Sequence, residues 1–163
     1  MKPHPTKQQP AASRLSETES SRTTNPLQRF LIMQAKEVMS QPAVSVSPRR
    51  TLRELESLFE IHGFNGVPVV EDHHLVGMAT QFDFLKQLVF TPGSVFPHYD
   101  ELMKRSVEEI MTRTVYTVHP STPLTRVLQM MVDTRDKSLP VVDDKNRLVG
   151  IISRGDIVRA FKR

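Results

Sequence analysis

The chain contains no cysteine and no tryptophan in its 163 residues. Without cysteine it can form no disulfide bond, no thiolate metal site and no cysteine nucleophile. No segment approaches the roughly 20 consecutive apolar residues of a membrane-spanning helix, and the first residues hold no apolar run typical of a secretion signal. We therefore expect a soluble, cytoplasmic protein with no membrane partner.

The chain is also poor in the features of a nucleic-acid-binding protein. Its net charge is only +4, and aromatic residues make up 6% of the sequence. Residues 1–26 hold four Lys or Arg and two Glu, so half of the net charge lies there (4 − 2 = 2). Nucleic-acid binders usually concentrate basic residues on one face, with interleaved aromatic side chains. We therefore expect no nucleic-acid partner.

Motifs of catalysis and of metal binding are missing as well. The sequence has no nucleophile elbow, no Walker loop and no paired-acid motif, so we expect no enzymatic activity. His73 and His74 are adjacent, so on a strand they would point to opposite faces, and in a turn they would be exposed. Because no His or acidic residue stands at a ligand spacing from them, we expect no metal site.

Apolar residues are sparse before residue 27 and regular after it. Ser, Thr, Gln and Pro dominate residues 1–26, which cannot bury enough surface to offset their ordering entropy, and we expect a disordered tail there. From Leu27 to Met39 the apolar residues follow a partial helical spacing that predicts a lead-in helix. With 38% hydrophobic residues, the chain can build one ordinary core or two small ones that share an interface.

An internal repeat dominates the remaining sequence. VMSQPAVSVSPRRTL at 38–52 aligns with IMTRTVYTVHPSTPL at 110–124, an offset of 72 (110 − 38). The PVV of 68–70 aligns at the same offset, whereas the LVG of 75–77 aligns with the LVG of 148–150 at an offset of 73. The one extra residue falls in a polar turn, where insertions are tolerated. The chain is therefore a duplication of one unit.

Each copy predicts the same first two elements. Alternating residues at 44–46 and 115–118 predict a short strand that ends at a proline. Thr51 with Glu54 predicts a capping box at the start of a helix that Gly63 ends. In the second copy Thr122-Pro123 predicts the helix start, with threonine as N-cap and proline in the first turn.

The rest of each copy predicts a hairpin and a closing helix. The hairpins are expected at 67–70 with 75–80 and at 139–142 with 148–153, around polar turns. The closing helices begin near Asp83 and Asp156, where the helix dipole favours a negative charge. The predicted order in each copy is strand, helix, strand, strand, helix.

This pattern resembles the cystathionine-β-synthase (CBS) domain. The resemblance rests on the VPVV or LPVV strand, the LVG return strand and the repeated Gly-hydrophobic-x-Ser/Thr-x-x-Asp motif, and it covers residues 36–90 and 107–162. The chain is thus similar to a stand-alone tandem CBS module. The resemblance implies an α/β (α+β) fold in which two pseudo-twofold repeats pack through their sheets, with two clefts between them.

The predicted domains follow from the repeat. A lead-in helix and the first repeat occupy 27–90, a linker 91–106 and the second repeat 107–163. The apolar residues of the linker either cover the module, which we favour, or face a partner: Val95, Phe96, Tyr99, Leu102 and Met103. Met130 and Met131 are expected as filler of the core or of a dimer contact.

The resemblance also implies a function. In similar modules the clefts bind adenosine-containing ligands (AMP, ADP, ATP, S-adenosylmethionine or NAD), and the module regulates a partner protein and forms a homodimer. A carboxylate suits the two ribose hydroxyls, a hydroxyl with helix N-terminal amides suits a phosphate, and apolar strand residues suit adenine. The alternative is a dimerisation or protein-interaction module that needs no ligand.

Two sets of cleft residues follow from the resemblance. The favoured cleft would contain Ile151, Ser153, Arg154, Asp156, Ser40, Val44, Phe64, Asn65 and Gly66. The second cleft would contain Met78, Thr80, Asp83, Thr112, Tyr116, Lys137 and Ser138.

The favoured cleft is preferred for its neighbouring residues. Arg154 and the small Gly155 stand beside Asp156, whereas Phe82 is expected to crowd the second cleft and Asp136 to add negative charge to it. Simpler roles stay open: the aspartates and hydroxyl residues can cap helices or end strands, and Arg154 can be an ordinary surface charge.

Overall fold

The computed structural model of the chain describes residues 25–89 and 99–162. The disordered tail predicted for 1–26 lies outside this part except for its last two residues, and Pro26 already belongs to a helix. Nowhere in the described ranges is a helix long and apolar enough to cross a membrane.

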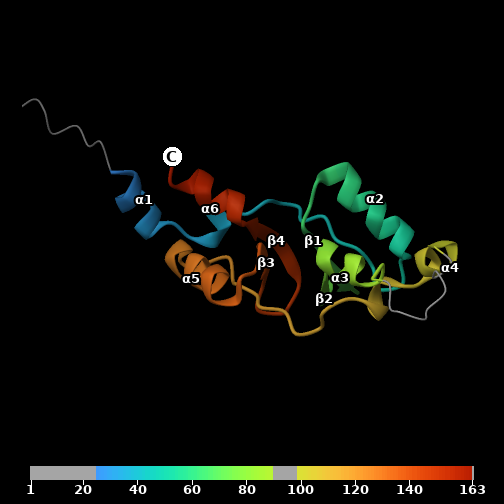
Figure 1. Cartoon of the computed structure of the whole chain (residues 1–163). Helices are drawn as coiled ribbons and strands as arrows, with labels where there is room; N and C mark the ends of the chain where they lie inside the picture. Colours follow the sequence, from blue (N-terminus) through green and yellow to red (C-terminus); the bar gives the residue numbers. More distant parts are fainter. Residues whose placement is uncertain (1–24, 90–98, 163) are drawn as a thin grey trace, which may run out of the picture.

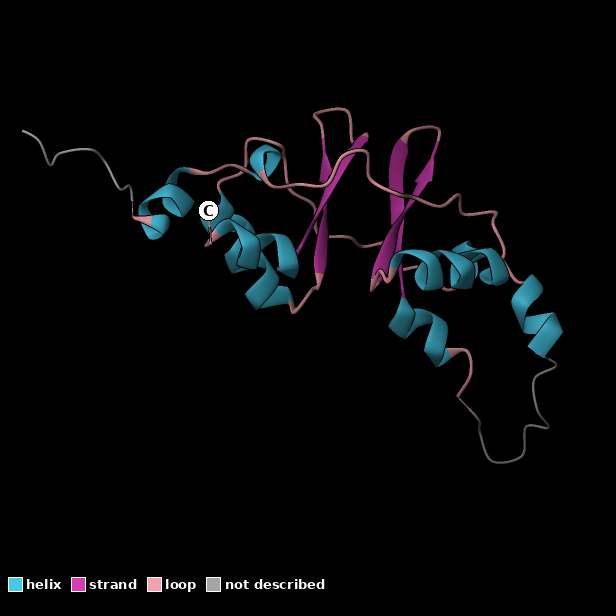
Figure 2. Cartoon of the chain, turned by 90° about the horizontal axis from the view of Figure 1, so that it is seen from above, coloured by secondary structure: helices cyan, strands magenta, loops and turns pink. Residues whose placement is uncertain are grey.

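The two copies fold into two similar halves, which lie at opposite ends of the molecule (Figure 1). The first half contains α2 (Leu52–His62), β1 (Gly66–Glu71), β2 (His74–Thr80) and α3 (Gln81–Lys86). The second contains α5 (Leu124–Thr134), β3 (Ser138–Val142), β4 (Leu148–Ser153) and α6 (Arg154–Ala160). Both hairpins lie side by side in the middle, with the main helices outside them (Figure 2). This arrangement confirms the predicted fold class.

The first strand predicted in each copy is reduced to a single parallel bridge. Val46 pairs only with Val69, and Val118 only with Val141. The Val46 amide donates to the carbonyl of Pro68 at 3.0 Å. A ladder cannot continue past Pro48 because proline has no amide hydrogen to donate. The prediction of full strands was therefore wrong in extent, although the pairing sites are correct.

Local signals set the helix ends in the first half. Thr51 accepts from the Glu54 amide and Glu54 accepts from the Thr51 amide, so the predicted capping box is confirmed, and Gly63 ends α2 with φ of 63°. The helix start predicted at Thr122 is wrong. Pro123 is the residue before α5, and the Thr122 hydroxyl instead accepts a hydrogen bond from the His119 amide at 2.9 Å.

The segment before each repeat packs on the opposite half. The predicted lead-in helix ends early, at α1 (Pro26–Ile32), and a 3₁₀ turn, η1 (Ala35–Glu37), follows. Phe30 stacks on Phe161 of the second half with ring centres 3.9 Å apart.

The segment before the second repeat likewise packs on the first half. In the predicted linker lies α4 (Tyr99–Lys104), and η2 (Val107–Glu109) opens the predicted second repeat. Both pack on the first half, where the Val107 amide donates to the Arg50 carbonyl at 2.8 Å. Leu102 and Met103 are buried in the core of the first half, which confirms the covering role for these two. Tyr99 stays about half exposed, and Val95 and Phe96 lie outside the described residues.

Two glycines allow these segments to cross the hairpins closely. A Cβ on Gly150 would lie 2.6 Å from the Met39 sulfur, and a Cβ on Gly77 would lie 2.7 Å from the Met111 sulfur. The chain then continues into a bridge between Ser40 and Ile151. The glycine of each LVG motif therefore brings the start of one repeat against the return strand of the other, and this contact builds the walls of the clefts.

Candidate functional site

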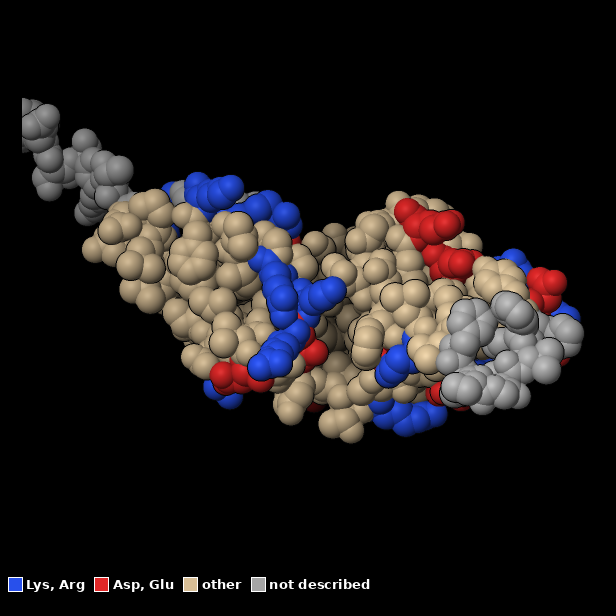
Figure 3. All heavy atoms as spheres, in the orientation of Figure 1, with Lys and Arg blue, Asp and Glu red and all other residues tan. Residues whose placement is uncertain are grey.

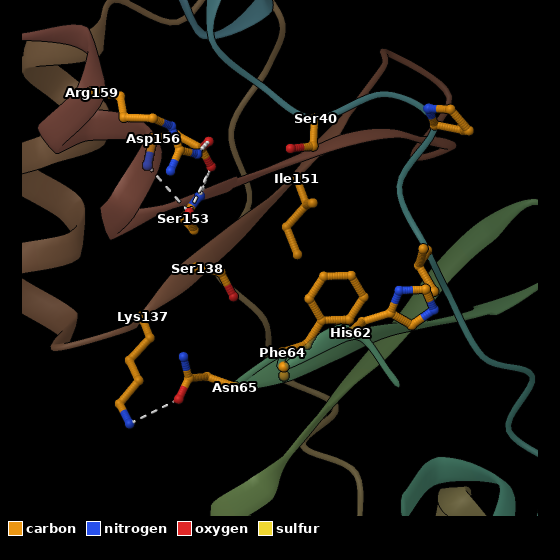
Figure 4. A pocket seen from close by; sticks show the side chains of 14 residues that line it. Ser40, His62, Phe64, Asn65, Lys137, Ser138, Ile151, Ser153, Asp156 and Arg159 are labelled. Atoms are coloured by element: carbon orange, nitrogen blue, oxygen red, sulfur yellow. Dashed lines mark hydrogen bonds and ion pairs between the residues drawn. The ribbon is translucent and has the colours of Figure 1, made fainter. Parts of the chain in front are cut away.

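The larger of the two clefts is a cavity of about 500 Å³ between the halves. We call it the Asp156 cleft. Its walls come from both repeats (Figure 4): Ser40, Pro42, Val44, His62, Gly63, Phe64, Asn65, Gly66, Lys137, Ser138, Ile151, Ser153, Asp156 and Arg159.

Asp156 forms the polar wall of this cleft at the start of α6. One carboxylate oxygen accepts from the Ser153 amide and from the Ser153 hydroxyl, both at 2.7 Å. The Ser153 hydroxyl in turn accepts from the Asp156 amide at 3.3 Å. The other carboxylate oxygen pairs with the guanidinium of Arg159, one turn later. The capping role that the sequence left open is therefore present, and it fixes a buried carboxylate at the cavity wall.

The opposite wall is aromatic (Figure 4). The rings of His62 and Phe64 stack with centres 4.8 Å apart and an angle of 8° between their planes. Gly63 between them adopts a left-handed conformation, which turns the chain sharply after α2. A flat, weakly polar surface of this kind suits a planar heterocycle such as a nucleobase.

A contact between Lys137 and Asn65 joins the two repeats at the wall of this cleft. The Lys137 ammonium donates to the side-chain oxygen of Asn65 at 3.3 Å, and these two residues occupy equivalent positions in the repeats (137 − 72 = 65). Lys137 and Arg159 together give the walls two cationic side chains against one carboxylate, Asp156. Excess positive charge in a hollow site favours an anionic ligand.

The second cleft is a smaller cavity of about 330 Å³. We call it the Thr80 cleft. Its walls are formed by Met78, Thr80, Thr112, Thr114, Val115, Tyr116, Thr134, Asp136, Ser138 and Pro140. Thr134 and Asp136 take the places of His62 and Phe64, so the aromatic pair is lost, and no Lys or Arg is among these described wall residues. The negative charge expected from Asp136 is therefore present at this wall.

The structure brings together all residues predicted for the favoured cleft except Arg154. The Arg154 side chain turns away and donates to the carbonyls of Asp136 at 3.0 Å and Arg135 at 2.6 Å. These carbonyls follow the C-terminus of α5, where the helix dipole attracts a cation. The assignment of Arg154 to the cleft was therefore wrong.

The second predicted set is placed less completely. Met78, Thr80, Thr112, Tyr116 and Ser138 line the Thr80 cleft, and Ser138 also reaches the Asp156 cleft. The other two predicted residues lie elsewhere. Lys137 lines the Asp156 cleft, because its side chain crosses to Asn65. Asp83 is buried, caps α3 through Thr80 and pairs with Lys86 at 2.7 Å, without lining the cavity.

Phe82 does not crowd the Thr80 cleft, contrary to the prediction. Its side chain is 70% exposed on the outer face of α3, and the Lys86 ammonium lies 5.3 Å from its ring centre. Its position early in α3 directs it away from the cavity wall that Thr80 forms.

Four wall residues of the Asp156 cleft were not predicted from the sequence: Pro42, His62, Gly63 and Arg159. Arg159 could have been predicted from the sequence, because it stands three residues after Asp156 and so shares its helix face. His62 is the last residue of α2, and it also lines the cleft. The described residues contain no group of three His, Cys, Asp or Glu that could hold a metal ion.

Comparison with known proteins identifies the architecture. A family profile described as "CBS domain" matches residues 35–89 and 107–163. The L-aspartate semialdehyde sulfurtransferase of Methanocaldococcus jannaschii is 32% identical over 141 residues, which are 86% of this chain and 25% of that protein. The chain thus spans about a quarter of the length of this curated relative.

Two solved structures share both the fold and a moderate sequence identity. The CBS domain pair of protein MJ0100, in complex with 5′-methylthioadenosine and S-adenosyl-L-methionine, is 32% identical with a TM-score of 0.67, covering 80% of this chain and 97% of that one. CBSX2 in complex with AMP is 27% identical with a TM-score of 0.67, covering 80% of this chain and 98% of that one.

Proposed function

The chain belongs to the CBS-domain family, and we propose that it is a regulatory module that binds an adenosine nucleotide in the Asp156 cleft. One observation carries this proposal: the cleft holds a buried carboxylate on one wall and a stacked aromatic pair on the other. The two similar structures with bound adenosyl compounds support the ligand class.

The chemistry of the walls matches the parts of such a ligand. The Asp156 carboxylate accepts hydrogen bonds from the two ribose hydroxyls, and the His62–Phe64 pair offers a face on which adenine stacks. Lys137 and Arg159 supply positive charge for a phosphate. Their charge favours AMP, ADP, ATP or NAD over S-adenosylmethionine, whose sulfonium is itself cationic.

Regulation follows from the position of the cleft. A ligand that touches both halves stabilises one relative arrangement of the two repeats, and it shifts the equilibrium only by its differential affinity for that arrangement. A regulated protein or a second copy of the chain then responds to this arrangement. We assign no catalytic step to the module, because the Ser153 hydroxyl that contacts Asp156 is engaged in capping α6.

A thermal-shift panel with AMP, ADP, ATP, NAD and S-adenosylmethionine tests the proposal. A ligand at 100 times its Kd stabilises the folded state by about 2.7 kcal/mol, so the melting temperature rises with ligand concentration. Calorimetry on the stabilising ligand then gives its affinity and stoichiometry. If none of the five compounds raises the melting temperature, the chain is instead an interaction module that works without a ligand.

A further inference from the structure

The Thr80 cleft offers hydrogen-bonding groups that the protein itself does not use. Its cavity of about 330 Å³ falls within the roughly 300–1,000 Å³ of small-molecule sites. Two wall hydroxyls are engaged locally: Thr80 donates to the Asp83 carboxylate at 2.6 Å, and Thr134 donates to the Met130 carbonyl at 2.9 Å. The remaining wall hydroxyls form no side-chain hydrogen bond with any described residue: Thr112, Thr114, Tyr116 and Ser138.

Asp136 gives this wall a negative charge that is held in place. Its amide donates to the Thr134 hydroxyl at 3.3 Å, and its carbonyl accepts from the Arg154 guanidinium at 3.0 Å. Arg154 itself lines an outer cavity between α5 and α6 and not the Thr80 cleft. Within the described ranges the partly buried Asp136 carboxylate forms no ion pair. A carboxylate of this kind is stabilised by a cation that comes from outside.

The cation that the repeat provides for this cleft is held outside it. Lys86 is the counterpart of Arg159 at the offset of 73 (159 − 73 = 86). It pairs with Asp83 at 2.7 Å, and its ammonium lies 5.3 Å from the centre of the Phe82 ring. Arg159 lines its own cleft, whereas Lys86 is not among the wall residues of the Thr80 cleft.

The neighbouring positive charges belong to the other cleft or to the outer surface. Lys137 follows Asp136 directly in the sequence, yet it lines the Asp156 cleft. On the face that Figure 3 shows, basic side chains gather over α6 and at the boundary between the halves. A phosphate in the Thr80 cleft would therefore meet the Asp136 carboxylate with no Lys or Arg among the described wall residues to compensate the repulsion.

We propose that the Thr80 cleft is a second ligand site with the opposite charge preference, which takes a cationic nucleoside and selects it through Asp136. The carboxylate attracts the positive group, and the unused hydroxyls donate to or accept from ribose and base. The Tyr116 ring, with Met78 and Pro140, offers apolar surface for the base. S-adenosylmethionine, whose sulfonium is cationic, is a compound of this class.

Two cavities of opposite charge let one module distinguish two classes of ligand. The Asp156 cleft then responds to a phosphorylated nucleotide and the Thr80 cleft to a sulfonium compound. Because the cavities are separate, the ligand of the Thr80 cleft can be measured without a nucleotide in the other. Failure of one site is therefore distinguishable from failure of the other.

Calorimetry of the full chain with S-adenosylmethionine and S-adenosylhomocysteine tests the charge preference. The two compounds differ only in one methyl group and in the positive charge on sulfur. We expect S-adenosylmethionine to bind at least about tenfold more tightly, the effect of one charge-assisted contact. Equal affinities, or no binding of S-adenosylmethionine, would overturn the assignment of a cationic ligand.

Asp136→Asn tests the residue that sets the preference. We expect its affinity for S-adenosylmethionine to fall at least about tenfold and its affinity for S-adenosylhomocysteine to stay nearly the same, so that the preference disappears. Asp133→Asn is the matched control, because Asp133 is exposed on α5 and lines neither cleft. An Asp136→Asn variant that keeps the wild-type preference would show that another group selects the ligand.

Competition with AMP tests which cleft is occupied. Saturating AMP is expected to leave S-adenosylmethionine bound, since the two compounds occupy different cavities. Displacement by AMP would place both in the Asp156 cleft and overturn the second site. If AMP does not bind at all, the proposed function fails, and the comparison of Asp136→Asn with wild type still decides the Thr80 cleft.

Discussion

The guanidinium of Arg159 pairs with the carboxylate of Asp156 across one turn of α6, inside the cleft between the two repeats. The other oxygen of this carboxylate caps the helix through Ser153. Asp156 is therefore held in place and charge-compensated before any ligand enters. In the proposed binding mode, with the ribose at Asp156, the pairing also keeps a cation near the phosphate.

Arg159→Gln separates these two roles. We expect AMP affinity to fall about ten- to a hundredfold, because a charge-assisted hydrogen bond is worth roughly 1.5 to 3 kcal/mol. Adenosine, which has no phosphate, is expected to bind unchanged or more tightly. Calorimetry with both compounds measures the split, and an equal loss for both would show that Arg159 only positions Asp156.

Asp156→Asn removes the negative charge while preserving an oxygen that can cap α6. We expect AMP affinity to fall about tenfold or more, because both ribose hydroxyls lose a charged acceptor. The equivalent Asp83→Asn in the first repeat is the control, since Asp83 does not line the Asp156 cleft. Unchanged AMP binding in Asp156→Asn would contradict the site assignment.

Phe64→Asp introduces into the Asp156 cleft the residue type found at the equivalent position of the Thr80 cleft, Asp136. Loss of a stacking base contact costs about 1 to 3 kcal/mol, so adenosine and AMP are both expected to bind at least about fivefold more weakly. Tyr116→Ala, in the other cleft, provides a control that removes an aromatic ring elsewhere. Equal adenosine affinities in Phe64→Asp and wild type would exclude stacking on this wall.

Gly150→Ala is expected to destabilise the fold by about 1 to 3 kcal/mol, because its Cβ would overlap the Met39 side chain and approach the Ser40 carbonyl at 3.1 Å. Gly155→Ala is the matched comparison. Its Cβ has space, and alanine favours a helix by up to about 1 kcal/mol over glycine. Urea unfolding of both variants measures the difference, and the reverse order of stability would refute the close-crossing argument.

We expect the turn between β3 and β4 to make the stability of the fold depend on pH in the acid range. Hydrogen bonds from the Arg147 side chain and amide, together with the Lys145 amide, lower the pKa of Asp143 from 3.8 to about 2. A carboxyl with a lowered pKa stabilises the fold above its unfolded value, and this contribution disappears as the pH falls from about 4 to 2. Asp143→Asn should therefore unfold more easily at pH 7, with a smaller further loss across this interval. An unchanged acid transition would contradict this role.

Much of the fold could be predicted because its signals are local. The Thr51–Glu54 capping box, the end of α2 at Gly63 and the repeated hairpins all depend on residues within a few positions of each other. Thr122 shows the limit of such signals. Its hydroxyl accepts a hydrogen bond from the His119 amide, which precedes it, instead of capping α5.

The cleft was harder to predict because its walls come from distant segments. Arg154 and Arg159 flank Asp156 in sequence. The Arg154 side chain instead donates to backbone carbonyls just after the end of α5, so it does not line the cleft. Lys137 crossed to Asn65 and so joined the opposite cleft from the one predicted. Sequence spacing says nothing about these competing partners, which the packing of the two halves creates.

The sequence by itself determined the duplication, the order of elements and the helix start at which Asp156 stands, since periodicity and caps act over a few residues. Only the tertiary structure decided that His62 joins Phe64 in facing this carboxylate, and that Phe82 points outward instead of into the Thr80 cleft. The reason is physical: Gly77 and Gly150 let the segments that start the two repeats cross the hairpins closely, and this crossing fixes which distant side chains share a cavity.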